Sequence, residues 1–272
     1  MQHQQLRRYL GIVALVGLGL AACGRDESTP STTGDYQPAS LLEAVLLGNR
    51  SAVDQFIAEG ADVNAAEDDG TTPLMRAVHG KFTDIAQRLI DAGADVAARN
   101  EYGVTALYLA ARSGDAAATR ALLVAGLDAN TALPGGETAL MTAARSGHTD
   151  VVGVLLTGKN AIESLADLLG PGAANERSGY AAANNAGYGD GDRLPAPRNR
   201  ADVNARERRY GDTALMWAAV AGNVDVVRLL IEAGADVRAV DDEGVTALHL
   251  ARAKGHTEVA AALLAAGANP NG

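Results

Sequence analysis

Two short stretches of the sequence bring together residue types that serve phosphate and metal chemistry. Residues 153–160 read Gly-Val-Leu-Leu-Thr-Gly-Lys-Asn, the spacing of a loop whose backbone N–H groups cradle phosphate and whose next Ser or Thr holds magnesium. Asn160 stands at that last position, and residues 151–156 have the apolar pattern of a packed helix. Residues 187–192 hold two aspartates between glycines, but they lack the twelve-residue calcium loop and its terminal Glu. We therefore expect a structural helix at the first stretch and a solvated loop at the second.

The other side chains with catalytic potential lack the spacing of a known site. None of the five histidines belongs to a His-x-x-x-His motif, and the sequence has no Gly-x-Ser-x-Gly turn of a serine hydrolase. We interpret His148, His249 and His256 as structural. A single cysteine excludes an intrachain disulfide and a thiolate metal cluster. The sequence therefore predicts a protein that is not an enzyme and that uses no metal ion and no cofactor.

Composition narrows the fold and the partners. The 272 residues are 47% apolar and 21% charged, enough to fold one or two domains, but only 4% are aromatic, which argues against a β-sandwich or barrel. The formal net charge is −10, and an acidic surface repels the phosphate backbone of a nucleic acid. Nucleic acid is therefore not an expected partner.

The N-terminal residues have the layout of an export signal. Arg7 and Arg8 precede an apolar run over residues 10–22. At 1.5 Å per residue a helix of this run would be about 20 Å long, shorter than the ~30 Å hydrocarbon core of a bilayer. We expect residues 1–22 to be a signal peptide and residues 23–36, rich in Ser, Thr, Asp and Gly, to be a flexible tether.

The apolar run ends in Leu20-Ala21-Ala22-Cys23, which resembles the lipobox of bacterial lipoproteins. The resemblance implies that Cys23 is acylated and becomes the first residue of a mature chain facing the periplasm. Two or three acyl chains hold a protein stably on a bilayer. Gly24, rather than Asp, at the next position favours the outer membrane over the inner one. The alternatives are a soluble export signal and a buried thiol in an ordinary helix.

Self-similarity with a period of 33 residues organises the rest of the sequence. The motif Gly-x-Thr-(Pro or Ala)-Leu starts at Gly70, Gly103, Gly136, Gly211 and Gly244, and a second series, Gly-Ala-Asp or a variant, starts at Gly60, Gly93, Gly126 and Gly234. Apolar residues at helical spacing lie between the two series, with a glycine near the middle. Each unit is therefore predicted to contain two short helices and an extended loop.

Residues 211–237 closely resemble an ankyrin repeat: they read Gly-Asp-Thr-Ala-Leu-Met-Trp-Ala-Ala-Val-Ala-Gly-Asn-Val-Asp-Val-Val-Arg-Leu-Leu-Ile-Glu-Ala-Gly-Ala-Asp-Val. The resemblance implies an all-α solenoid of helix-turn-helix repeats with short β-hairpin fingers. Thr213 is placed to cap the first helix, and the small Ala218 and Ala219 permit close stacking of repeats. Gly234 suits a left-handed helix end.

The phase of the pattern gives six repeats over residues 37–272, at 37–69, 70–102, 103–135, 136 to about 210, 211–243 and 244–272. The first and last depart from the pattern, as terminal caps of a stacked array do, and Ser40 is expected to cap the first helix. In the second, Lys81 stands where other repeats have Gly, so an altered turn is expected. Repeat four carries 42 extra residues at about 159–200, and this insertion is either functional or disordered.

A stacked solenoid offers an extended concave surface for binding. In ankyrin proteins, partners contact the finger tips and the residues before the mid-repeat Gly. The resemblance therefore assigns partner binding to Asp68, Asp69, Thr71, His79, Glu101, Tyr102, Val104, Arg112, Glu137, Arg145, Arg209, Tyr210, Asp212, Asp242 and Glu243. Tyr102 and Tyr210 stand out because Tyr is enriched among interface anchors. Acidic tips in repeats two and six, with arginines between them, indicate a partner of mixed charge.

The sequence thus favours a non-enzymatic, lipid-anchored scaffold, monomeric and facing the periplasm, that binds one protein partner on its concave face. The alternative is an immunity protein that neutralises a toxic enzyme delivered into the periplasm. A third alternative is an enzyme whose site lies in the insertion, but no sequence motif supports it.

Overall fold

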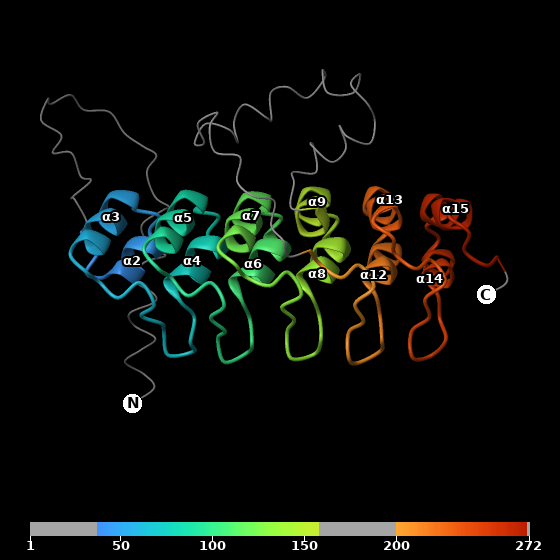
Figure 1. Cartoon of the computed structure of the whole chain (residues 1–272), viewed down its shortest axis with the longest axis horizontal. Helices are drawn as coiled ribbons and strands as arrows, with labels where there is room; N and C mark the ends of the chain where they lie inside the picture. Colours follow the sequence, from blue (N-terminus) through green and yellow to red (C-terminus); the bar gives the residue numbers. More distant parts are fainter. Residues whose placement is uncertain (1–36, 158–199, 271–272) are drawn as a thin grey trace, which may run out of the picture. The chain divides into compact units, whose positions relative to one another are not determined.

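The computed structural model describes residues 37–157 and 200–270, and those from Pro38 onward belong to one compact unit. The described residues form twelve α-helices in six consecutive pairs, which stand side by side in a row (Figure 1). The pairs are α2 (Leu41–Leu46) with α3 (Arg50–Ala58), α4 (Pro73–His79) with α5 (Thr83–Asp91), α6 (Ala106–Ser113) with α7 (Ala116–Val124), α8 (Ala139–Ser146) with α9 (Thr149–Thr157), α12 (Ala214–Ala221) with α13 (Val224–Glu232), and α14 (Ala247–Lys254) with α15 (Thr257–Ala265). The predicted all-α solenoid is confirmed. The expected signal peptide, Cys23, the tether and residues 158–199 of the insertion lie outside the described residues.

Side-chain caps and buried alanines shape the first helix of each pair. A threonine oxygen accepts the backbone N–H three residues on, at 3.3–3.4 Å, in Thr72, Thr105, Thr138, Thr213 and Thr246, which satisfies a free donor at the helix start. Ser40 caps α2 in the same way. Ala110 with Ala111, and Ala218 with Ala219, have no exposed surface. Small side chains let neighbouring first helices pack closely. The expected helix cap at Thr213 and the expected close stacking at Ala218 and Ala219 are therefore confirmed.

Side chains that follow the mid-repeat glycine bond to the backbone of the preceding repeat. His148 Nε2 lies 3.2 Å from the carbonyl oxygen of Arg112, and His256 Nε2 makes the equivalent contact at 3.0 Å. Asn223, at the same place in the fifth repeat, donates to the carbonyl of Ala144 at 2.8 Å. The structural interpretation of these two histidines is therefore confirmed.

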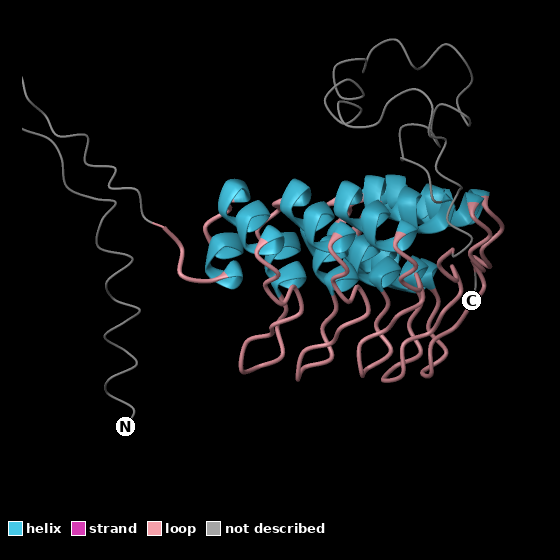
Figure 2. Cartoon of the chain, turned by 60° about the vertical axis from the view of Figure 1, so that its left-hand side comes forward, coloured by secondary structure: helices cyan, strands magenta, loops and turns pink. Residues whose placement is uncertain are grey.

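Long loops join each pair to the next and project from one side of the row (Figure 2). We call these loops fingers and name each after the helix that follows it: the α4 finger (59–72), the α6 finger (92–105), the α8 finger (125–138), the α12 finger (200–213) and the α14 finger (233–246). In place of hairpin strands, the described residues have isolated antiparallel bridges, at Ala132 with Thr138, Arg206 with Thr213, and Val240 with Thr246. These bridges lie in the α8, α12 and α14 fingers, and backbone hydrogen bonds also join neighbouring fingers, as from the Glu101 N–H to the Asp69 carbonyl at 2.9 Å.

The insertion in repeat four leaves the stack in register on both sides. Asn130, at the base of the α8 finger, donates to the carbonyl of Arg200 at 3.2 Å and accepts the N–H of Asp202 at 2.6 Å. The N–H of Ala201 donates to the carbonyl of Leu155 at 2.9 Å. The chain therefore leaves α9 and returns beside it, and helices α8 and α12 pack together as neighbours.

Repeat two has the altered turn that its sequence predicts. Helix α4 is followed by Gly80 in a right-handed conformation, and Lys81 then takes a φ of 58°, the only positive φ of a non-glycine among the described residues. The equivalent Gly114 has a φ of 76°. A left-handed conformation costs a residue with a Cβ atom about 1–2 kcal/mol.

Replacing Lys81 by Gly should raise the free energy of unfolding by about 1 kcal/mol, because glycine adopts the left-handed conformation without a steric penalty. Urea unfolding followed by circular dichroism measures the change. Lys81→Ala is the control, since it shortens the side chain but keeps the Cβ atom and its strain, and it should bring no gain. A loss of stability in Lys81→Gly would contradict this account of the turn.

Candidate functional site

An arginine and a tryptophan stack where repeats four and five meet. Arg145, near the end of α8, places its guanidinium carbon 4.6 Å from the centre of the Trp217 ring in α12. Trp217 is the single tryptophan of the chain and is half-buried. Glu137 Oε1 lies 3.2 Å from Arg145 Nη2 and also accepts from the Thr142 hydroxyl at 2.8 Å. We call Glu137, Thr142, Arg145 and Trp217 the Arg145–Trp217 cluster.

Asp212, in the same repeat as Trp217, is a second polar neighbour of the indole. The Trp217 side chain donates a hydrogen bond to the Asp212 carboxylate. Burial raises the pKa of Asp212 above its usual range, and this hydrogen bond acts in the opposite direction. The indole ring therefore has the Arg145 guanidinium of the preceding repeat and the Asp212 carboxylate of its own repeat as polar neighbours.

Between its Asp and its Gly, the α12 finger has one residue more than the other fingers. The interval from Asp128 to Asp202 is 74 residues, whereas the interval from Gly136 to Gly211 is 75. The extra residue therefore lies between Asp202 and Gly211, at the tip of the finger, and the remaining 41 extra residues precede Asp202. An alignment on the glycine series alone, as in the sequence analysis, assigns all 42 to the insertion.

The buried side chain of Glu207 accepts backbone hydrogen bonds from this longer tip. Its carboxylate accepts the backbone N–H of Arg209 at 2.6 Å and that of Tyr210, and 8% of the residue is exposed. In the shorter α6 and α14 fingers, Asn100 accepts the N–H groups of Tyr102 and Val104, and Asp241 accepts those of Glu243 and Val245. Glutamate has one more methylene than these residues, which matches the extra residue of the tip. Burial alone would raise the pKa of Glu207, but the backbone N–H groups lower it below its usual value.

Arginines and a tyrosine form the outer surface of the same tip. Arg206, Arg208 and Arg209 are exposed, and Tyr210 is 47% exposed. The guanidinium carbon of Arg209 lies 5.0 Å from the centre of the Tyr210 ring. Arg206 pairs with Asp242 of the α14 finger at 2.9 Å. The tip thus presents one arginine that ties two fingers together and two that face solvent.

Most of the predicted partner-binding residues lie on the surface. The exposed ones are Asp68, His79, Glu101, Tyr102, Arg112, Arg145, Arg209, Tyr210, Asp242 and Glu243, and the half-buried ones are Asp69, Val104, Glu137 and Asp212. The structure brings Glu137 to Arg145, and Arg209 to Tyr210. Thr71 departs from the expectation: it is buried, with 8% of its surface exposed, and its N–H donates to Asp69 Oδ1 at 2.8 Å. Thr71 therefore belongs to the framework of the α4 finger.

Five residues of the site, namely Thr142, Arg206, Glu207, Arg208 and Trp217, were not among the sequence predictions. The sequence analysis assigned no role to Trp217, although its position in α12 is a variable one, occupied by Arg76, Leu109, Thr142 or Leu250 in the other repeats. Arg206, Glu207 and Arg208 belong to the longer tip, which an alignment on both repeat series would have revealed. The variable position in the first helix and the one-residue offset were the available signals.

The other chemical candidates do not add to this site. Helix α9 (Thr149–Thr157) confirms the helical interpretation of the phosphate-loop candidate, while its residues 158–160 and the calcium candidate at 187–192 lie outside the described residues. His249 Nδ1 lies 3.1 Å from the Thr246 hydroxyl of its own repeat. Among residues 37–157 and 200–270, no group of three His, Cys, Asp or Glu side chains is placed to hold a metal ion. None of the helices described has the length and hydrophobicity needed to cross a membrane.

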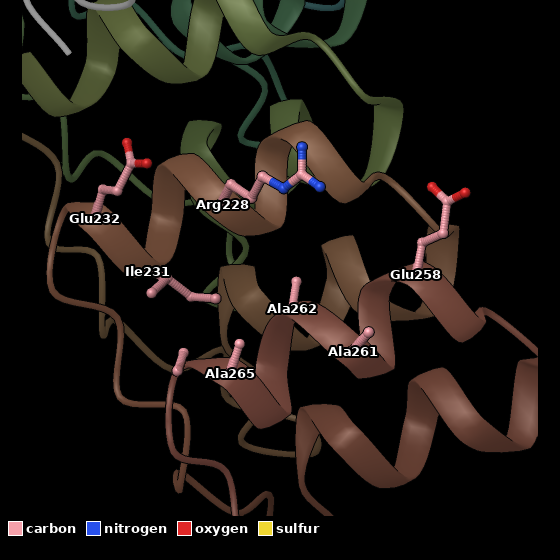
Figure 3. A pocket seen from close by; sticks show the side chains of 8 residues that line it. Arg228, Ile231, Glu232, Glu258, Ala261, Ala262 and Ala265 are labelled. Atoms are coloured by element: carbon pink, nitrogen blue, oxygen red, sulfur yellow. The ribbon is translucent and has the colours of Figure 1, made fainter. Parts of the chain in front are cut away.

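A shallow groove of about 500 Å³ runs between α13 and α15 (Figure 3). Its lining combines Ile231 with alanines and three charged side chains, namely Ala261, Ala262, Ala265, Ala266, Arg228, Glu232 and Glu258. The groove exists because α15 carries small alanines where α13 carries larger residues. It lies between second helices, in the layer opposite the fingers (Figure 1), and is separate from the Arg145–Trp217 cluster.

Comparison with protein families identifies the repeats. A family model described as ankyrin repeats in three copies matches residues 41–132 and 179–272. A model of the single ankyrin repeat matches residues 135–165. Together they cover the array on both sides of the insertion.

Individual relatives share only part of their length with this chain. The nuclear factor NF-kappa-B p105 subunit of Gallus gallus is 46% identical over 71 residues, which is 26% of this chain and 7% of that protein. The Notch-regulated ankyrin repeat-containing protein A of Danio rerio is 43% identical over 49 residues, which is 18% of this chain and 44% of that protein. The chain therefore matches less than half the length of these curated relatives.

Solved structures are similar over most of the chain. An ankyrin repeat domain from Acinetobacter baumannii has a TM-score of 0.63 and 26% identity, with 84% of this chain and 98% of that chain covered. The ankyrin repeat domain of Bcl-3 has a TM-score of 0.62 and 26% identity, with 87% of this chain and 88% of that chain covered. The row of helix pairs with projecting fingers is thus found in other proteins as a whole.

Glu207→Gln should destabilise the chain by about 1–2 kcal/mol at pH 7, because the backbone N–H groups of the tip lose a charged acceptor. The folded-state pKa of Glu207 lies below its ordinary value near 4.5. The stabilisation is therefore present above that ordinary value and is lost as the pH falls through the folded pKa. Urea unfolding of both proteins at pH 7 and at about pH 3 should show the difference shrinking in acid. Glu243→Gln, at an exposed tip position, is the matched control; an equal loss for Glu207→Gln at both pH values would refute the role of its charge.

Proposed function

The chain belongs to the ankyrin repeat family, and we propose that a protein partner docks on its fingers and first helices around the Arg145–Trp217 cluster. Ankyrin repeats generally form interaction modules for protein partners, typically without enzymatic activity. The observation that carries the proposal is the stack of Arg145 on a half-buried Trp217 at the junction of repeats four and five. A solenoid uses its framework residues for packing, so such side chains at variable positions are free for recognition.

Two physical properties of the cluster support this role. Tryptophan, tyrosine and arginine dominate the binding energy of protein interfaces, because they offer large contact areas together with hydrogen-bond donors. Glu137 and Asp212 already hold the two stacked side chains with hydrogen bonds. A side chain that is ordered before binding loses less conformational entropy when the partner docks. The cluster is therefore a preorganised anchor.

We propose in addition that the chain is a lipoprotein of the cell envelope. The support is the lipobox-like sequence Leu20-Ala21-Ala22-Cys23 behind an export signal. Acyl chains on Cys23 would tether the array to the membrane, facing the periplasm, and Gly24 favours the outer membrane. The array would then meet partners within reach of the tether that follows Cys23.

Cys23→Ser should release the protein from the membrane fraction, because acyl chains provide the anchor and serine accepts none in this pathway. Cell fractionation and incorporation of labelled palmitate measure this. Tyr36→Ser, which leaves the cysteine in place, is the control and should stay labelled and membrane-bound. Labelling that persists in Cys23→Ser would contradict the proposed anchor.

Trp217→Ala combined with Arg145→Ala should weaken partner binding about thirtyfold, the effect of losing a hot spot worth about 2 kcal/mol. Tagged full-length chain is used to capture proteins from an envelope extract, and the captured protein is then titrated against each variant. Arg228→Ala with Glu232→Ala, on the groove between α13 and α15, is the control. Circular dichroism checks that every variant is folded.

The outcomes of this capture separate the candidate functions. A partner that is lost with the cluster variant and kept with the control supports the proposal. A partner that binds all variants equally would place the interface elsewhere on the array. If the cell yields no partner, a toxic enzyme delivered from outside becomes the one to test, which corresponds to the immunity function that the sequence left as its alternative.

A further inference from the structure

The finger tips differ in charge, and the α12 finger is the basic one. The tip of the α4 finger reads Glu-Asp-Asp at residues 67–69, and that of the α14 finger reads Asp-Asp-Glu at residues 241–243. The α12 finger instead reads Arg-Glu-Arg-Arg-Tyr at residues 206–210. In a chain with a formal net charge of −10, this cluster is a local reversal of the surface charge.

Contacts within the array already use part of this charge. Arg206 pairs with Asp242 at 2.9 Å and donates to the carbonyl of Val240 at 2.5 Å. The buried Glu207 carboxylate is occupied by backbone N–H groups of the tip. Arg208 and Arg209 are exposed, and neither forms an ion pair with any residue in the described part of the chain. Within the described residues, these two side chains are therefore the cations of the tip without an ion pair.

A backbone hydrogen bond anchors the main chain at Arg208, and the Tyr210 ring packs against the side chain of Arg209. The N–H of Arg208 donates to the carbonyl of Gly135 in the α8 finger at 2.8 Å. The guanidinium of Arg209 lies over the ring of Tyr210. A stacked guanidinium keeps its N–H edge free, and that edge matches a carboxylate with two parallel hydrogen bonds.

We propose that the tip of the α12 finger binds an acidic segment of the protein partner, with carboxylates of that segment on Arg208 and Arg209 and an apolar side chain against Tyr210. The inference rests on the proposed function and names the chemistry of the partner.

The surroundings of the tip favour a protein segment over a nucleic acid. The acidic tip of the α14 finger lies one repeat away, and packed helices are spaced about 8–10 Å apart. This spacing is close to the Debye length of about 8 Å at physiological salt, so those carboxylates act on any ligand that extends beyond the basic tip. A long polyanion would therefore meet repulsion on that side, whereas a short acidic segment fits within the reversed patch.

Fluorescence anisotropy with the full chain tests the proposal. The probe is a labelled peptide of eight glutamates with one central tryptophan; the matched peptide has glutamines in place of the glutamates, and an eight-residue oligothymidylate carries similar charge on phosphates. We expect the acidic peptide to bind at least about tenfold more tightly than the other two. Arg208→Glu with Arg209→Glu should abolish this preference, and Arg228→Glu with Arg252→Glu, the control of equal charge change, should preserve it.

Each other outcome overturns the inference in a defined way. Equal binding of the acidic and glutamine peptides would exclude charge recognition. Stronger binding of the oligothymidylate would make the patch a site for phosphate polyanions. A captured partner that is lost with the Trp217 and Arg145 variant but binds normally to Arg208→Glu with Arg209→Glu would refute the acidic segment while leaving the proposed function intact.

Discussion

A single repeat of this array cannot bury its own apolar face, so the structure depends on hydrogen-bonded stacking between neighbours. Side chain to backbone bonds fix the register of that stacking at two levels. At the finger bases, Asn64, Asn130 and Asn204 each accept from and donate to the backbone of the next repeat. At the helix turns, His148, Asn223 and His256 reach the last carbonyls of the preceding first helix. Buried alanines between the first helices then bring the repeats close.

The candidate site exists only because this register holds across the insertion. Arg145 comes from repeat four and Trp217 from repeat five, with residues 158–199 between them in sequence. The bonds of Asn130 to the chain at Asp202, and of Ala201 to Leu155, restore the stacking on the far side of the insertion. The hydrogen bonds that stack the repeats therefore also bring together Arg145 of one repeat and Trp217 of the next.

The sequence correctly predicts the local features that recur in each repeat. The cap at Thr213, the left-handed Gly234, whose φ is 91°, and the altered turn at Lys81 all follow from residue types at fixed phase. It missed Trp217 and Glu207 because their roles depend on contacts that the period does not encode: a cation from the preceding repeat, and a tip that is one residue longer. Thr71 is the opposite case: its place at a finger tip predicted an exposed side chain, but the residue is buried. The expected export signal and lipidation at Cys23 fall on residues that the structure does not describe.

The central claim is that recognition takes place on the fingers and first helices around the junction of repeats four and five. Hydrogen–deuterium exchange of the full chain, with and without its captured partner, tests this most directly. The account predicts slower exchange on binding at the tips of the α8 and α12 fingers and in α8 and α12, with little change in the second helices. Protection confined to α13 and α15, beside their groove, would contradict it.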